Sequence, residues 1–168
     1  IATLGQEFID HPKNISLREA VKGGGINFDE YYRHQLRIIY RLLFIFVIEE
    51  RNLVFGESKT SELKRFNQIY FNYYSLLRLR KLAKKLPPPE ANRHYDIWLS
   101  LLNTFSLFEK KEIGEKLGIM SLEGDLFGYD AICSSSYDLH QCYINNLVLL
   151  NIIKSLTYFE NENKVLIP

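Results

Sequence analysis

Apolar residues recur at three- and four-residue intervals along most of the chain, which is the period of an amphipathic helix. The longest such stretch begins after Asn27, whose side chain can cap a helix. It continues to about Phe55, where Gly56 offers a left-handed C′ position. The same spacing predicts further helices over 61–73, 76–86, 95–110 and 145–156. The sequence therefore predicts a mainly α protein, an irregular bundle of about five helices.

Polar residues and prolines mark where several of these helices start and stop. Thr60 or Ser61 can cap the helix over 61–73, and Ser75 can break that helix and cap the next one. The prolines 87–89 must end the latter, because proline lacks the amide hydrogen. In the helix over 95–110 the spacing predicts five buried side chains, namely Trp98, Leu101, Leu102, Phe105 and Phe108.

The first part of the chain predicts a short helix followed by a break. Ser16 and Glu19 have the spacing of a capping box, so a helix should follow them and end at the glycine triplet 23–25. Glycines lose much backbone freedom when they are ordered, so the triplet predicts a hinge. On this basis residues 1–25 form a short helix and hinge, and residues 26–168 form the main helical domain.

The two chain ends add further expectations. Apolar residues at 158–159 and 165–167 flank a polar stretch and predict a short β hairpin. The chain begins with Ile1 and has no charged segment followed by an apolar one, so we expect a piece of a larger protein without a signal peptide. Its longest apolar run, Leu42 to Ile48, is too short for a bilayer, which needs about 20 residues.

Charge is distributed unevenly, although the net charge is only +1. Residues 1–58 carry seven Lys/Arg and eight Asp/Glu, residues 59–93 carry nine and two, and residues 94–168 carry five and ten. The basic middle could face a nucleic acid or could dock on the acidic segment of its own chain, and the sequence leaves both open. The chain has only two cysteines, which indicates a reduced, cytoplasmic setting rather than a disulfide scaffold.

One cluster within the basic middle is a candidate for contact with the DNA backbone. Its five residues fall within eight positions, where they would neutralise phosphates without reading base sequence. They are Arg78, Arg80, Lys81, Lys84 and Lys85. The alternative is an exposed helix that packs on a larger parent protein.

A second basic feature is a stripe of three arginines, Arg33, Arg37 and Arg41, spaced four residues apart. The stripe lies beside strongly apolar positions, so we interpret it as structural, with guanidiniums that reach carboxylates of neighbouring helices. Glu49, Glu50 and the acidic last third of the chain offer those carboxylates.

We find no catalytic, cofactor-binding or metal-binding motif. The glycines 23–25 have no strand before them, and residues 86–89 place Leu86 where an adenine-binding motif requires an amide. Acidic-x-lysine pairs, as in magnesium nucleases, occur at Glu57/Lys59, Glu109/Lys111 and Glu162/Lys164, and we interpret them as solvated surface charge. Cys133, His140 and Cys142 lack a fourth ligand and zinc-site spacing, so a buried thiol or a loop cysteine is expected instead.

Four segments together carry a resemblance to a known family. They are YYRHQLRIIYRLLFIFVIEER at 31–51, YYSLLRLRKLA at 73–83, DIWLSLLNTF at 96–105 and NLVLLNIIKSLTYF at 146–159. In this order and spacing, over most of residues 28–168, the chain resembles the helical region that precedes the methyltransferase domain of type IIG restriction-modification enzymes. It departs from that pattern at 122–127, where LEGDLF replaces a glycine-rich approach to Leu-Phe.

The resemblance implies a non-catalytic connector in a phage-defence protein. The parent would use S-adenosylmethionine to methylate adenine in DNA and could also cleave DNA with magnesium. This chain would bind neither cofactor, would pack on the methyltransferase domain of the same polypeptide and could contact double-stranded DNA. The alternative is a stand-alone helical module that binds another protein and has no role on DNA.

Overall fold

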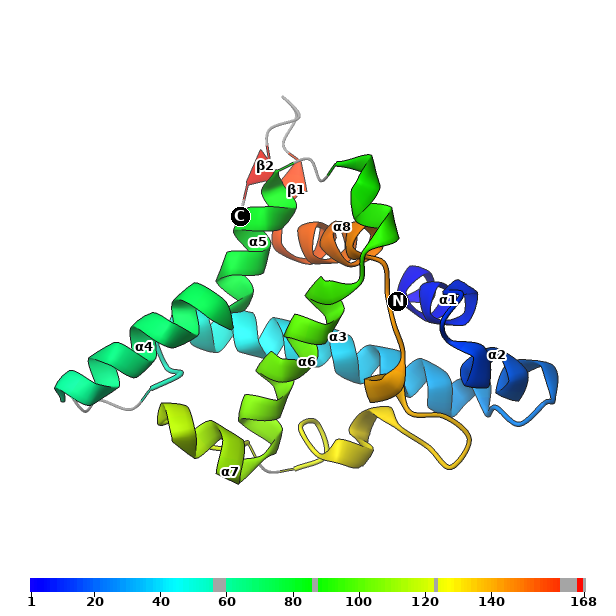
Figure 1. The fold of residues 1–168 in the computed structure, drawn as a ribbon, viewed down its shortest axis with the longest axis horizontal. Coiled ribbons are helices and arrows are strands. Elements are labelled where there is room, and N and C mark those ends of the chain that lie inside the picture. Colours follow the sequence, from blue (N-terminus) through cyan, green and yellow to red (C-terminus); the bar gives the residue numbers. More distant parts are fainter. Residues whose placement is uncertain (56–59, 86–87, 123, 161–165, 168) are drawn as a thin grey trace.

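The computed structural model describes residues 1–55, 60–85, 88–122, 124–160 and 166–167, and it is mainly α-helical (Figure 1). In chain order the α-helices are α1 (Ala2–Asp10), α2 (Ile15–Lys22), α3 (Phe28–Glu50), α4 (Ser61–Tyr73), α5 (Leu76–Lys84), α6 (Asp96–Glu109), α7 (Lys111–Gly114) and α8 (Asn146–Thr157). Short 3₁₀ helices are η1 (Pro89–Arg93), η2 (Glu115–Leu117), η3 (Tyr129–Ile132) and η4 (Leu139–Gln141). The predicted fold class is confirmed, and α1 and α7 are additional to the predicted helices.

A two-stranded antiparallel sheet follows α8. It consists of β1 (Phe159–Glu160) and β2 (Leu166–Ile167), with Phe159 paired to Ile167. These strands lie where the sequence predicted a hairpin.

Side-chain caps begin three of the helices as the sequence predicted. Asn27 accepts hydrogen bonds from the first-turn amides of Asp29 and Glu30 at the start of α3. Thr60 caps α4, and Ser75 ends the α4 segment and caps α5. Each cap satisfies a backbone N–H that has no partner inside its own helix.

Two predicted helix ends are wrong, and both errors have a local cause. Helix α3 ends at Glu50 rather than near Phe55. The reason is that Asn52 takes the left-handed conformation (φ 55°), which the sequence predicted at Gly56. The amide of Leu53 then bonds to the carbonyl of Ile48, which closes the helix end. Gly56 itself lies outside the described residues.

Helix α2 also differs from its prediction at the start. It begins at Ile15 after Asn14, so Ser16 and Glu19 lie inside the helix and form no capping box. The glycine triplet forms the end of α2. Gly24 is left-handed (φ 69°), and the Gly25 amide bonds to the carbonyl of Ala20.

Helix α3 forms the back of the molecule in Figure 1, and α6 crosses in front of it. Helices α5 and α8 lie above this crossing, α1 and α2 at one end of α3, and α4 at the other. The core fills the space between α3, α5, α6 and α8. Its fully buried members include Ile38, Leu42, Leu79, Trp98, Leu101, Phe105, Phe108, Leu149 and Ile153. Leu102, which was predicted to be buried, is only partly buried.

Residues 1–25 share this core. Leu4, Phe8 and Leu17 are at most 1% exposed, and the ring of Phe8 meets that of Trp98 edge to face at 5.2 Å. Tyr31 of α3 also donates a 2.7 Å hydrogen bond to the carbonyl of Gly5. The N-terminal helices therefore pack on the same core as the rest of the chain.

A membrane crossing requires a helix both long and apolar, and none of the helices in the described ranges meets that requirement.

Candidate nucleic-acid interface

The basic cluster of residues 78–85 lies on α5 and at its C-cap, where Leu76, Leu79 and Ala83 face the core. Two of its members are used in packing. Arg80 forms an ion pair with Glu50 of α3, and Arg78 donates to the hydroxyl of Ser100 on α6 at 3.4 Å. These two arginines therefore hold α5 against its neighbours.

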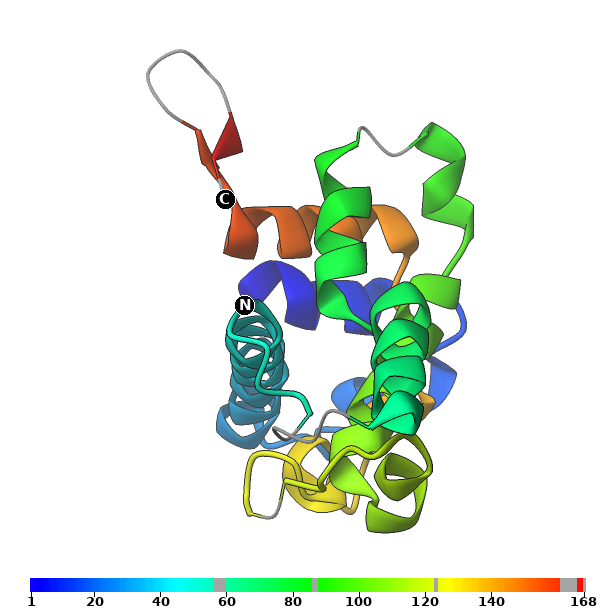
Figure 2. The same ribbon diagram turned by 90° about the vertical axis from the view of Figure 1, so that its left-hand side faces the viewer.

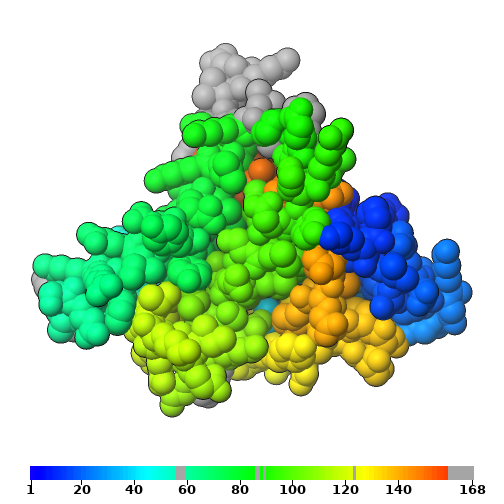
Figure 3. Space-filling model, in the orientation of Figure 1, coloured from blue at the N-terminus to red at the C-terminus, as the bar shows by residue number. Residues whose placement is uncertain are grey.

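The other three members, Lys81, Lys84 and Lys85, are exposed. Among the described residues none of them takes part in an ion pair, and Lys84 lies 5.8 Å from the ring centre of Tyr158. Figure 3 shows α4 and α5 together on one side of the molecule. The lysines of α5 thus form a small cationic surface on a helix held by its apolar side.

The three members of the arginine stripe have different environments. Arg33 is exposed, and Arg37 is partly buried and donates to the carbonyl of Ala131 at 3.1 Å. Arg41 is completely buried and lies 2.5 Å from a carboxylate oxygen of Glu109, which belongs to the acidic last third of the chain. The four-residue spacing therefore does not place the three guanidiniums in one kind of site.

Arg41 is the centre of a buried ionic network. Its Nε and Nη2 donate to the carbonyls of Leu126 and Gly128 at 2.7 and 2.9 Å, in addition to the pair with Glu109. The guanidinium also lies 5.3 Å from the ring centre of Phe105. A buried guanidinium with this many acceptors ties α3 to the end of α6 and to the loop that precedes η3.

His140 joins the network from the other side. Its Nδ1 is 2.7 Å from a carboxylate oxygen of Asp138, and its Nε2 is 3.6 Å from Glu109. Tyr129 stacks on the imidazole at 4.4 Å and donates to the second oxygen of Asp138. Burial lowers the pKa of His140, but the two carboxylates outweigh burial, so this pKa is raised overall.

The carboxylate of Glu49 caps a helix rather than pairing with the arginine stripe. It is 1% exposed and accepts from the Tyr70 hydroxyl and from the first-turn amides of Leu76 and Leu77 in α5, at 2.7 to 2.8 Å. Burial raises its pKa, although these hydrogen bonds favour the charged form. Its neighbour Glu50 takes the opposite position, at the surface with Arg80.

The structure shows where one acidic-x-lysine pair and the two cysteines lie. Glu109 is wrongly predicted as solvated surface charge, since its side chain is 5% exposed, whereas that of Lys111 is 73% exposed. The other two acidic-x-lysine pairs, Glu57/Lys59 and Glu162/Lys164, lie outside the described residues. Cys142 is buried and Cys133 lies in a loop, both as free thiols. Within the described ranges no three His, Cys, Asp or Glu side chains are arranged to hold a metal ion.

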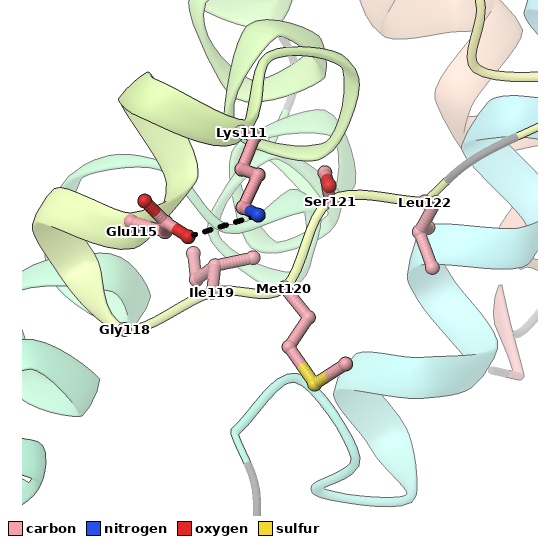
Figure 4. Close-up of a pocket in the computed structure, with 7 residues that line it drawn as sticks. All are labelled: Lys111, Glu115, Gly118, Ile119, Met120, Ser121 and Leu122. Carbon is pink, nitrogen blue, oxygen red and sulfur yellow. Dashed lines mark ion pairs between the residues drawn. The ribbon is translucent and has the colours of Figure 1, made fainter.

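A hollow of about 730 Å³ lies beside α7 (Figure 4). Its lining includes Ile119, Met120 and Leu122, together with the surface ion pair between Lys111 and Glu115. No buried acid, base or nucleophile lines it. The hollow therefore offers apolar contact rather than a reacting group.

Sequence reasoning expected the arginine stripe to reach carboxylates of the acidic last third, as Arg41 does, but it did not identify the network of Glu109, Asp138 and His140 around Arg41, or the role of Glu49. One local signal was present, because Asp138 two residues before His140 allows the aspartate to accept from both the amide and the ring of that histidine. The partnerships of Arg41 and Glu49 join residues that are far apart in the chain, and no spacing rule predicts them.

Comparison of the chain with protein-family models, with curated proteins and with solved structures finds no match in any of the three.

Proposed function

We propose that this chain is a non-catalytic helical connector of a DNA adenine methyltransferase of the restriction-modification type. The connector packs on the methyltransferase domain of its polypeptide, and α5 lies against the DNA backbone. The resemblance of residues 28–168 to type IIG enzymes supports the family. The observation that carries the DNA contact is the exposed trio Lys81, Lys84 and Lys85, which has no ion-pair partner among the described residues.

The physical argument for this contact is electrostatic. Lysines on a rigid helix neutralise phosphates and release bound counterions, which supplies affinity that does not depend on base sequence. Arg78 and Arg80 belong to the same cluster but hold α5 to α6 and α3. The proposed DNA surface is therefore narrower than the cluster of five that the sequence indicated.

The test is binding of duplex DNA to the wild-type chain and to a variant with Lys81→Gln, Lys84→Gln and Lys85→Gln. Wild-type binding should be weak and independent of sequence, and log K should fall with log salt by about 0.9 per phosphate neutralised. The variant should lose most of this binding and reduce the salt slope by about 2.7 if each lysine neutralises one phosphate.

The matched control removes three other exposed lysines, with Lys110→Gln, Lys111→Gln and Lys116→Gln. It changes the net charge by the same amount but acts at α7 and η2. Equal losses in the two variants, or affinity that does not change with salt, would assign α5 to packing alone.

A second measurement addresses the absence of catalysis. S-adenosylmethionine titrated into the chain should give no saturable heat, because neither a cofactor loop nor an adenine-binding motif was found in the sequence. A micromolar one-site isotherm would contradict the connector proposal.

A protein-interaction module with no DNA role is the second candidate. It is favoured by one observation, the large apolar side chains that α3 exposes on its outer side, with Tyr40 at 53% and Val47 at 48%. Contiguous exposed apolar surface is typical of protein-binding sites.

A further inference from the structure

The outer side of α3 is apolar and uncovered. Tyr40, Leu43, Phe44 and Val47 follow helical spacing and are 38% to 53% exposed, and no charged residue lies between them on this side. Figure 2 shows α3 at one edge of the molecule, with no described element on its outer side. We call this surface, from Leu36 to Val47, the α3 ridge.

A hollow adjoins the ridge on each side. One of about 270 Å³ is lined by Arg37, Tyr40 and Leu126, among others. The other, of about 420 Å³, lies towards α8 and is lined by Ile39 and Ile152, among others. A ridge between two apolar hollows is a shape that can receive side chains from a facing helix on both sides.

Two exposed charges of opposite sign, Asp29 and Arg51, stand at the ends of the ridge, and a third exposed charge, Arg33, lies between Asp29 and the ridge on the same side. Asp29 lies eleven residues before Tyr40, and Arg51 lies eleven residues after it. Twenty-two residues are close to six helical turns, so both charges lie on the side of Tyr40, about 33 Å apart. Within the described residues neither of them forms an ion pair.

This pattern is self-complementary, and we propose that the α3 ridge binds the α3 ridge of a second copy of the chain. The two helices run antiparallel, with Tyr40 of each copy at the two-fold axis. Asp29 of one copy then faces Arg51 of the other at both ends, whereas a parallel arrangement would bring like charges together. Leu36, Leu43, Phe44 and Val47 fill the middle of the contact.

The ridge alone is too small for a stable dimer, so the contact must also include the two hollows beside it. A standard stable interface buries about 800 Å² on each partner, and the apolar middle of one helix supplies only part of that. The hollows towards Leu126 and towards α8 lie where the partner's side chains would enter. The self-association is independent of the DNA contact, which uses α5, so either proposal can fail without the other.

The first experiment is sedimentation of the 168-residue chain and its charge variants at micromolar concentrations. The wild-type chain should form dimers. Asp29→Arg and Arg51→Asp should each weaken dimerisation by about ten-fold, because each turns two attractive pairs into two repulsive ones. The double variant should recover to within about two-fold of wild type, since its pairs are attractive again.

A wild-type chain that stays monomeric would overturn the proposal. The proposal would also be overturned if the double variant dimerised as weakly as the two single variants. Asp29 and Arg51 would then not interact with each other across the contact. Recovery in the double variant also excludes misfolding as the reason for the losses.

The second experiment locates the two-fold axis by crosslinking in a Cys133→Ser background, with Cys142 buried. Tyr40→Cys should form a disulfide-linked dimer on mild oxidation, because a residue at the axis meets its own copy within disulfide reach. Asn72→Cys, at an exposed position of α4, is the matched control and should stay monomeric. A dimer that gives no crosslink through position 40, or crosslinks equally at position 72, places the contact elsewhere and overturns the proposal.

Discussion

The inner and outer sides of α3 each depart at some positions from the usual division between charged surface and apolar core. On the inner side Arg41 and Glu49 are 0% and 1% exposed. On the outer side Tyr40 and Val47 are 53% and 48% exposed, although both are large and apolar. Burial along this helix therefore depends on the partners that other segments bring as well as on the hydrophobicity of each residue.

Arg41 and Glu49 can be buried because their polar atoms have hydrogen-bond partners. A buried charge is tolerated when it is paired and hydrogen-bonded, and Arg41 and Glu49 each have three polar partners. The exposed apolar residues incur no such penalty and remain available for contact. The inner side of α3 should accordingly determine stability, and the outer side association.

Arg41→Ala should produce the largest loss of stability. It leaves Glu109 buried without its cation and removes the donors to two carbonyls, which should cost about 3 to 5 kcal/mol. Arg33 belongs to the same stripe but is exposed, so Arg33→Ala should change the free energy of unfolding by about 0.5 kcal/mol or less. Denaturant unfolding of the two variants measures the difference, and equal midpoints would refute the buried role of Arg41.

Glu49→Ala should cause the next largest loss, lowering the free energy of unfolding by about 3 kcal/mol. The substitution leaves the Tyr70 hydroxyl and the amides of Leu76 and Leu77 buried without an acceptor at the start of α5. Glu50→Ala breaks only the surface pair with Arg80 and should cost less than about 1 kcal/mol. Urea denaturation of both variants checks this, and a loss at Glu50 as large as that at Glu49 would contradict the capping role.

His140→Gln should lower the free energy of unfolding by less than Glu49→Ala does, and the loss should depend on pH. The pKa of His140 is raised in the folded protein above its ordinary value of 6.5. Its protonated ring therefore contributes stability that is fully present below pH 6.5 and is lost as the pH rises through the folded pKa. We expect a loss of about 1.5 kcal/mol at low pH that narrows as the pH is raised.

The comparison with wild type isolates His140 from other groups that titrate. Burial lowers the pKa of His11 and His34, but both histidines are present in both proteins and cancel in the difference. Asp138 has a lowered pKa and loses its contribution only as the pH falls through that value. Unfolding measured across weakly acidic and weakly basic pH should show the narrowing, and a constant difference would refute it.

Tyr40→Ser should change monomer stability least, by about 0.5 kcal/mol or less, because the side chain is half exposed and α3 is held from its other side. The measurement is thermal unfolding at a protein concentration below that at which the chain associates. A large loss there would mean that the outer side of α3 also contributes to the fold of the single chain.

The positions of the helices followed from local rules. Asn27, Thr60 and Ser75 were recognised as caps because a cap depends on a few neighbouring residues. The end of α3 was placed too late because asparagine, like glycine, can take the left-handed position, and Asn52 does so first.

The sequence by itself determined the mainly α fold, most helix positions and the location of the basic cluster, because these depend on spacing, caps and composition. Only the tertiary structure decided which members of each charged group are buried. Arg41 meets Glu109 across 68 positions of sequence, and Glu49 meets the start of α5 across 27. Such pairs form when helices pack, so nothing in the neighbouring residues distinguishes Arg41 from Arg33 or Glu49 from Glu50.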